Sequence, residues 1–273
     1  MSCETVDSIE SISIAQQESS PPPAHCAGFN YGDSVFFIDG TLINKIVNTS
    51  SVLAGKFGAT PEGLSIDSLT GAIDVNLSDA GLKYEVYYVA TGGTDTCKTN
   101  VIISGIDYLS SINVLSENDT LISPVYNSQV GLGLPGDDDD DDDDEDDDDD
   151  DEQNEFDLSG SAQLLGVAID TVTGAINLQQ TVDNGTFGVT PVSGTSQSVT
   201  IQYKLDDDSD RSLNSINVTV YYYDKLTDVP QSLLDEVTNK NNSLNTSVYT
   251  SARVSALARR PRPPAIIIVN TTR

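Results

Sequence analysis

The sequence predicts an all-β protein of two tandem β-sandwich domains, with a disordered acidic loop in the second domain and an extended C-terminal tail. The first observation is a repeat, because residues 63–74 (GLSIDSLTGAID) recur 103 residues later as residues 166–177 (GVAIDTVTGAIN). The second is a series of short β-branched or aromatic segments separated by Gly, Asn, Asp and Pro, which is typical of sandwiches. A repeat of this kind indicates duplicated modules.

A second correspondence predicts the boundaries of the two copies. Residues 39–48 resemble residues 118–127 at an offset of 79, which differs by 24 from the offset of the first repeat. The second copy is therefore expected to contain a 24-residue insertion that includes the acidic run 137–152. The predicted organisation is a flexible N-terminal tether (1–27), a first domain (28–107), a second domain (108–223) and a C-terminal docking segment (224–273).

Strand patterns fill both predicted domains. In the first domain we expect strands at 35–38, 42–47, 64–66, 72–77, 83–90 and 100–106. Partial alternation puts Tyr84, Val86 and Tyr88 on one face, and residues 92–95 (GGTD) supply a hairpin turn. In the second domain we expect strands at 112–114, 121–126, 168–169, 175–178, 187–192, 198–203 and 216–223. Alternation in the last strand predicts Tyr221 and Tyr223 in the core and Tyr222 outside.

The C-terminal segment has a different pattern. Pro near a helix start, acids in the early turns and apolar residues three and four apart predict a short helix over 230–237. Residues 265–269 (AIIIV) form a strand that must pair, either with one of this chain's own sheets or with a neighbouring protein by strand addition. The predicted docking residues are Arg259, Arg260, Arg262, Ile266, Ile267 and Ile268.

The charge of the chain excludes some partners. The net charge is -30, and 14 Asp and 2 Glu lie within residues 137–152. Nucleic acid is not an expected partner, because phosphate binding needs clustered cations. No stretch approaches eighteen apolar residues, so contact with a membrane is expected only through a lipid anchor.

The acidic run is the predicted metal site. Carboxylates suit calcium, which takes six to eight oxygen ligands, and the candidate ligands are Asp137, Asp138, Asp139, Asp140, Asp146 and Asp147. No glycine turn fixes a cage, so binding would be weak and diffuse. The alternative is a solvated loop that repels itself. No other cofactor is expected.

The composition is typical of an exported protein, because it is rich in Ser, Thr, Asn and Val with few Lys and no Trp, and the three cysteines fit this interpretation. Cys3 is the candidate acylated residue of a lipoprotein, with an ordinary disordered N-terminus as the alternative. Cys26 and Cys97 bracket the first domain and are the candidate disulfide, with free buried thiols as the alternative. The single histidine, His25, follows a proline run, which is a poor place for a general base that needs a rigid scaffold. No catalytic residues and no enzymatic activity are predicted.

Residues 61–73 (PEGLSIDSLTGAI) resemble the signature of the immunoglobulin-like repeats of bacterial surface proteins, which are similar to cadherin repeats. The resemblance implies a turn capped by Asp67, a permissive backbone at Gly71 and two inward-pointing isoleucines. The second copy keeps Asp170 and Gly174 but lacks the complete proline-glycine-leucine step. Both predicted domains would then be immunoglobulin-like sandwiches.

Together these features predict a non-enzymatic cell-surface or extracellular structural or adhesion protein, as a lipoprotein accessory subunit of an outer-membrane assembly. Its expected partner is another protein or a second copy of itself. One alternative is a virion or extracellular filament subunit that assembles by C-terminal strand exchange. Another is a calcium- or glycan-binding module.

Overall fold

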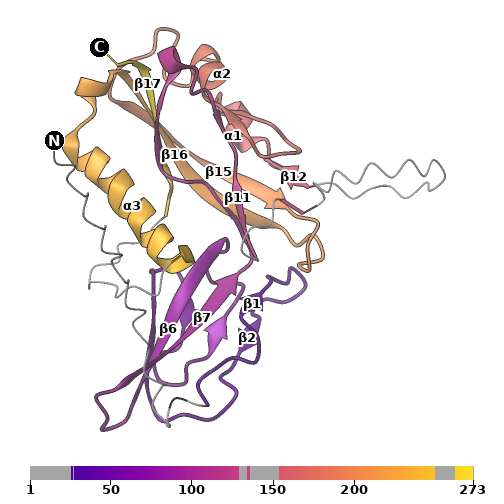
Figure 1. Ribbon diagram of the computed structural model, residues 1–273. Helices are drawn as coiled ribbons and strands as arrows, with labels where there is room; N and C mark the ends of the chain where they lie inside the picture. Colours follow the sequence, from indigo (N-terminus) through magenta and orange to yellow (C-terminus); the bar gives the residue numbers. More distant parts are fainter. Residues whose placement is uncertain (1–25, 27, 129–133, 136–153, 250–261, 273) are drawn as a thin grey trace, which may run out of the picture.

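The computed structural model describes residues 26, 28–128, 134–135, 154–249 and 262–272, and the side chains of these residues except 241–249. Within this part of the chain the protein is mostly β-structure in several sheets, as the predicted all-β class requires. Figure 1 shows two β-rich halves end to end, with one long helix along one side.

The first half consists of two sheets around a shared core, and we call it the N-terminal sandwich. One sheet has the order β1-β7-β6-β3 and the other the order β2-β5-β4. Alternate residues of β6, Tyr84, Val86 and Tyr88, lie in the core as predicted from their spacing. The strands are β1 (Val35–Phe36), β2 (Ile46–Val47), β3 (Gly55–Thr60), β4 (Ser65–Ile66), β5 (Ile73–Asp74), β6 (Leu82–Ala90) and β7 (Thr96–Ile103).

The second half, the C-terminal sandwich, repeats this plan with a larger sheet. Its sheets have the orders β12-β15-β16-β17-β9 and β10-β14-β13, and their inner faces share one core. A two-stranded pair of β8 (Gly105–Asp107) and β11 (Val125–Asn127) lies where the two sandwiches meet. The other strands are β9 (Ser111–Val114), β10 (Leu121–Ile122), β12 (Glu155–Phe156), β13 (Ala168–Ile169), β14 (Ile176–Asn177), β15 (Thr195–Lys204), β16 (Asn214–Lys225) and β17 (Ala265–Thr271).

A long helix, α3 (Gln231–Tyr249), packs on the outer face of the large sheet. It runs twelve residues beyond the predicted end at Val237. Leu233 and Val237 hold its first turns on the sheet. The shorter helical segments are α1 (Ser161–Leu164), α2 (Leu178–Asp183), η2 (Leu115–Glu117) and η3 (Leu226–Asp228).

The repeated corner forms the same turn in both sandwiches. Asp67 accepts hydrogen bonds from the amides two and three residues later, at 2.8 Å each, and Asp170 does so at 2.9 and 2.8 Å. Gly71 and Gly174 then take φ values of +73° and +69°, which glycine adopts without steric cost. The predicted turn chemistry is therefore present twice.

Two aromatic residues close each corner. The Tyr31 hydroxyl donates to the carbonyl of Gly71 at 2.7 Å, and the Tyr108 hydroxyl to that of Gly174 at 2.6 Å. A Cβ atom on either glycine would lie 2.7 Å from a ring carbon, of Phe57 in the first corner and Phe156 in the second. The two corners are thus equivalent in their tertiary contacts as well as in their sequence.

The predicted size of the insertion in the second copy is wrong. Ile46 of β2 pairs with Asp74, and Leu121 of β10 pairs with Asn177. Leu121 lies 75 residues after its counterpart Ile46, whereas Asn177 lies 103 residues after its counterpart Asp74. The second copy therefore has 28 extra residues between these strands and not 24. The reason is that equivalent strands are defined by their hydrogen-bond register. The sequence resemblance of residues 39–48 to 118–127 is shifted by four residues from that register, in which Ile46 corresponds to Leu121.

One predicted strand in the C-terminal sandwich is also wrong. Residues 187–191 form turns, and Gly185 and Gly188 take φ values of +83° and +98° there, which glycine adopts without steric cost. The strand predicted at 175–178 is present as β14 (Ile176–Asn177), and the Asn177 side chain accepts a hydrogen bond from the Gln180 amide at 2.9 Å and starts α2. Strands β3 and β12 were not predicted at all.

The three consecutive tyrosines of β16 lie opposite to the prediction. Tyr222 is in the core of the C-terminal sandwich, stacked on Phe187 with ring centroids 5.5 Å apart. Tyr221 and Tyr223 point to the other side, towards α3. The alternation is correct, but both faces of this sheet are covered, so polarity could not tell which face is the core.

Candidate functional site at the C-terminal strand

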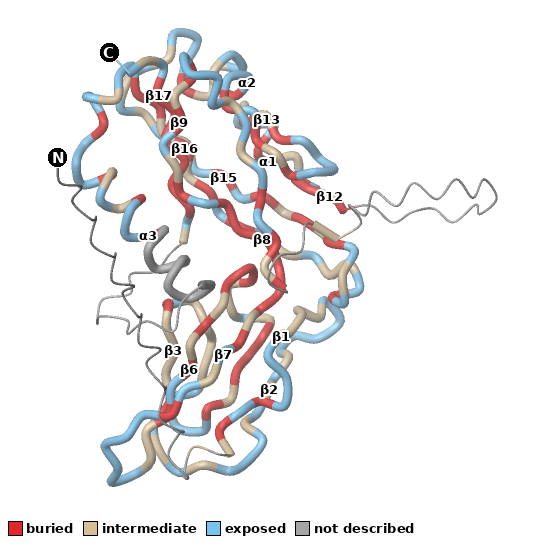
Figure 2. The backbone as a smooth tube through the Cα atoms, in the orientation of Figure 1, coloured by how far each residue is buried: buried red, intermediate tan, exposed pale blue. Residues whose placement is uncertain are grey.

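The last strand, β17, lies inside the large sheet and not on its edge. It runs parallel to β16 on one side and to β9 on the other. Residues 265–269 are at most 1% exposed, and Figure 2 shows β17 next to β9 and β16. The strand is therefore a central element of the C-terminal sandwich.

The predicted docking residues Ile266, Ile267 and Ile268 are part of this strand. Ile266 and Ile268 join the core of the sandwich, whereas Ile267 joins the cluster beneath α3. The structure thus pairs them with the chain's own sheet, one of the two alternatives, and not with an exposed docking surface. An unbroken run of isoleucines fits this position because both of its faces are buried. Arg259 and Arg260 lie outside the described residues.

Arg262 anchors the start of β17 at the junction of the two sandwiches. Its Nη2 atom donates to the carbonyl of Ile106 at 2.7 Å and lies 3.6 Å from Oδ1 of Asp107. The side chains of Arg262 and Asp107 are only 9% and 2% exposed. One residue later, the carbonyl of Pro263 accepts a hydrogen bond from Nζ of Lys240 on α3 at 2.6 Å. The segment before β17 is therefore held from both the junction and the helix.

The anchor is electrostatically unusual. Burial raises the pKa of Asp107 to about 6, although the charge of Arg262 and the Tyr108 amide act in the opposite direction. Among the described residues, neither Oδ2 of Asp107 nor Nε of Arg262 has a hydrogen-bond partner. Sequence reasoning missed Asp107 and Lys240; the available signal was a single acid between Ile106 and Tyr108 in a strand-like segment.

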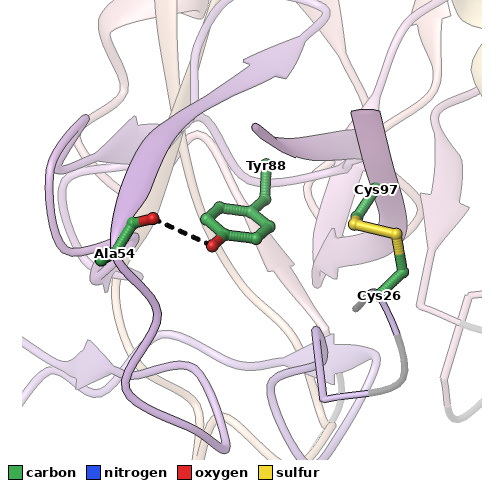
Figure 3. The surroundings of a disulfide bond; sticks show 4 residues. All are labelled: Cys26, Ala54, Tyr88 and Cys97. Carbon is green, nitrogen blue, oxygen red and sulfur yellow. Dashed lines mark hydrogen bonds between the residues drawn. A yellow bond between two sulfur atoms is a disulfide. The ribbon is translucent and has the colours of Figure 1, made fainter. Parts of the chain in front are cut away.

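The structure joins Cys26 and Cys97 in a disulfide with an S–S distance of 1.97 Å and a Cα–Cα distance of 5.3 Å. Cys97 is a buried residue of β7 and lies opposite Tyr88 of β6. Figure 3 shows the bond beside Tyr88, whose hydroxyl donates to the carbonyl of Ala54 at 3.1 Å. The disulfide therefore attaches the start of the N-terminal sandwich to its central hairpin.

The other predicted sites are outside the described part of the chain. Cys3 and the six candidate calcium ligands between Asp137 and Asp147 fall there, so lipidation and calcium binding stay predictions. Among the residues that the structure describes, no group of three His, Cys, Asp or Glu side chains could hold a metal ion. None of its helices in this part is long and apolar enough to cross a membrane.

Two hollows lie on the described surface. One, of about 600 Å³ over β10, β13 and β14, is lined by both polar and apolar side chains, among them Gln163, Asn177 and Ile169. The other, of about 360 Å³ at the junction of the sandwiches, is lined by residues that include Ile43 and Leu213. Neither has an aromatic ring in its lining, so neither offers the flat surface on which sugars usually stack.

Comparison with known proteins gives only slight likenesses. No protein-family model and no curated protein matches the chain. A SusE-like surface-located polysaccharide-binding protein from the heparin utilisation locus of Bacteroides thetaiotaomicron is 14% identical, with a TM-score of 0.23, over 72% of this chain and 33% of that one. Drosophila N-cadherin EC1-4 is 10% identical, with a TM-score of 0.20, over 69% of this chain and 47% of that one. The chain thus spans a third to a half of the length of these structures.

Proposed function

We propose that this chain is a non-enzymatic structural or adhesion protein of the cell surface or extracellular space. The observation that carries the proposal is the Cys26–Cys97 disulfide, which links residues 71 apart in sequence. Disulfides form and persist in oxidising compartments and are rare where glutathione keeps thiols reduced. A protein that depends on this bond would therefore work outside the cytosol.

The repeated corner supports a finer proposal about domains. The same turn, the same tyrosine hydrogen bond and the same phenylalanine contact occur once in each sandwich. We infer two tandem immunoglobulin-like domains over residues 28–107 and 108–223, with a C-terminal segment (224–273) that completes the second. Stacked rigid modules of this kind suit a protein that spaces or displays a contact surface.

We further propose that the chain is attached to a membrane through its N-terminal segment. Cys3 would carry a lipid anchor, and residues 1–27 would form the tether between the membrane and the first domain. The chain would then serve as an accessory subunit of an outer-membrane assembly, with another protein or a second copy as its partner.

Mass spectrometry of protein from native cells tests the proposal. Free thiols are blocked before lysis, the protein is digested without reduction, and intact cells are treated in parallel with an external protease. We expect a linked Cys26–Cys97 peptide, an acyl group on Cys3 and loss of the protein from protease-treated cells. Blocked Cys26 and Cys97 in a protein that resists external protease would overturn the surface assignment. A surface protein without an acyl group would overturn the anchor alone.

A further inference from the structure

The two sandwiches differ at one position in their large sheets. In the N-terminal sandwich β1 pairs directly with β7, in parallel, through Val35 and Ile102. The corresponding strand of the C-terminal sandwich is β9, since β1 starts four residues after Tyr31 and β9 three residues after the equivalent Tyr108. Strand β9 does not pair with β16, the counterpart of β7, because β17 lies between them. The C-terminal sandwich therefore contains a strand-sized slot that its sister copy lacks.

The slot between β9 and β16 contacts β17 along most of its length. Ile266 through Val269 pair with residues 111–114 of β9, and residues 265–269 and 271 pair with residues 219–223 and 225 of β16. Asn113 adds a side-chain hydrogen bond to the carbonyl of Ile267 at 3.2 Å. The contacts lie on both edges and both faces of the strand, so an empty slot would expose two unpaired strand edges and an apolar interior.

We propose that this slot is a strand-exchange site that accepts β17 from a second copy of this chain. The contacts that hold β17 are the same whether the strand comes from its own chain or from another. The choice between them therefore depends on concentration and on the connection to the strand. Twelve residues separate Tyr249 from Arg262, a length that can span at most about 45 Å when extended. That reach allows the strand to leave its own sheet and enter a neighbouring one.

The incoming segment would bring its own anchor. Arg262 precedes β17 and binds Ile106 and Asp107, and Pro263 accepts from Lys240. A donated strand would therefore fix its register by placing its arginine at the junction of the accepting copy. Crowding on a surface raises the local concentration and favours exchange between copies, which would join chains without any new interface.

Disulfide trapping between two full-length variants tests the exchange. Lys225 and Thr271 are paired positions at the end of β16 and β17, within the usual reach of a disulfide. One chain carries Lys225→Cys and the other Thr271→Cys, both in a Cys3→Ser background. The two are co-refolded from denaturant, oxidised and analysed by non-reducing electrophoresis and peptide mapping. A chain with both substitutions calibrates the geometry, and each single variant alone controls for random surface pairing.

We expect an interchain 225–271 disulfide whose yield rises roughly in proportion when the protein concentration is raised tenfold. Excess synthetic peptide 262–271 should suppress it. The inference is overturned if the doubly substituted chain links internally while the mixture gives no 225–271 link at any concentration. It is also overturned if the doubly substituted chain fails to link at all, because β17 would then not lie beside β16. Neither result bears on the surface location of the protein, which the thiol and protease experiment decides separately.

Discussion

The repeated corner gives the sharpest test of the fold, through the variants Gly71→Ala and Gly174→Ala. Both glycines have a positive φ, and a Cβ atom at either would lie 2.7 Å from a ring carbon of Phe57 or Phe156. Atoms cannot stay that close, so the substitution must displace the ring as well as strain the backbone. The two penalties have different origins and can be separated by a control.

The expected magnitudes follow from these two terms. A side chain in the left-handed region costs about 1–2 kcal/mol, and overpacking a core costs about 1–3 kcal/mol. Each corner variant should therefore lose about 2–5 kcal/mol in the free energy of unfolding. Gly92→Ala is the matched control, because Gly92 has a φ of +76° and no atom within 4 Å of its added Cβ. Gly92→Ala should therefore lose only the stability that a side chain in the left-handed region costs.

Equilibrium denaturation measures the difference. The chain has no tryptophan, so tyrosine fluorescence and circular dichroism would follow unfolding, with the two sandwiches fitted as separate transitions where the probes disagree. The Phe57→Leu substitution removes the ring. In a Phe57→Leu background, Gly71→Ala should therefore cost less stability than it does in the wild type, as expected for two residues in contact. Equal losses in Gly71→Ala and Gly92→Ala, with no coupling to Phe57, would refute the contact between glycine and ring.

Three further outcomes follow from the structure. Replacing Cys26 and Cys97 by serine should cost about 4 kcal/mol, because the bond closes a loop of about seventy residues; a reducing agent should lower the Tm of the wild type but not of the double variant. The folded-state pKa of Asp107 is about 6, above its usual 3.8, so the folded chain binds the extra proton and stability rises as the pH falls. Between pH 7 and 5 the wild type should gain about 1 kcal/mol more than Asp107→Asn, and equal pH profiles in denaturation would contradict the burial of this carboxyl. Tyr108→Phe should lose about 1 kcal/mol, the worth of a buried hydrogen bond, and an unchanged denaturation midpoint would show that its bond to Gly174 contributes nothing.

Features that depend on neighbours in the sequence were predictable. The turn at Asp67 uses hydrogen bonds that reach only two and three residues along the chain, so its residues specify it directly. The face occupied by Tyr84, Val86 and Tyr88 follows from the two-residue period of a strand. The strand over residues 265–269 was also predictable, because a run of β-branched apolar residues after prolines favours extended structure.

The candidate site depends on contacts that no local pattern encodes. Asn113 and Ile267 are 154 residues apart, and Arg262 lies 156 residues from Ile106. A run of isoleucines has no period, so it fits any position with two covered faces and does not specify which strands will flank it.

The sequence by itself determined that the chain is a duplicated β-protein, where its repeated corners turn and that its last apolar segment must pair with a sheet. Only the tertiary structure decided that this segment enters between β9 and β16, that α3 covers the sheet and that Asp107 and Arg262 are buried together. The physical reason is the distance along the chain over which the deciding interactions act. Turns and alternation are fixed by interactions within a few residues, whereas strand order and burial depend on which distant surfaces exclude water together.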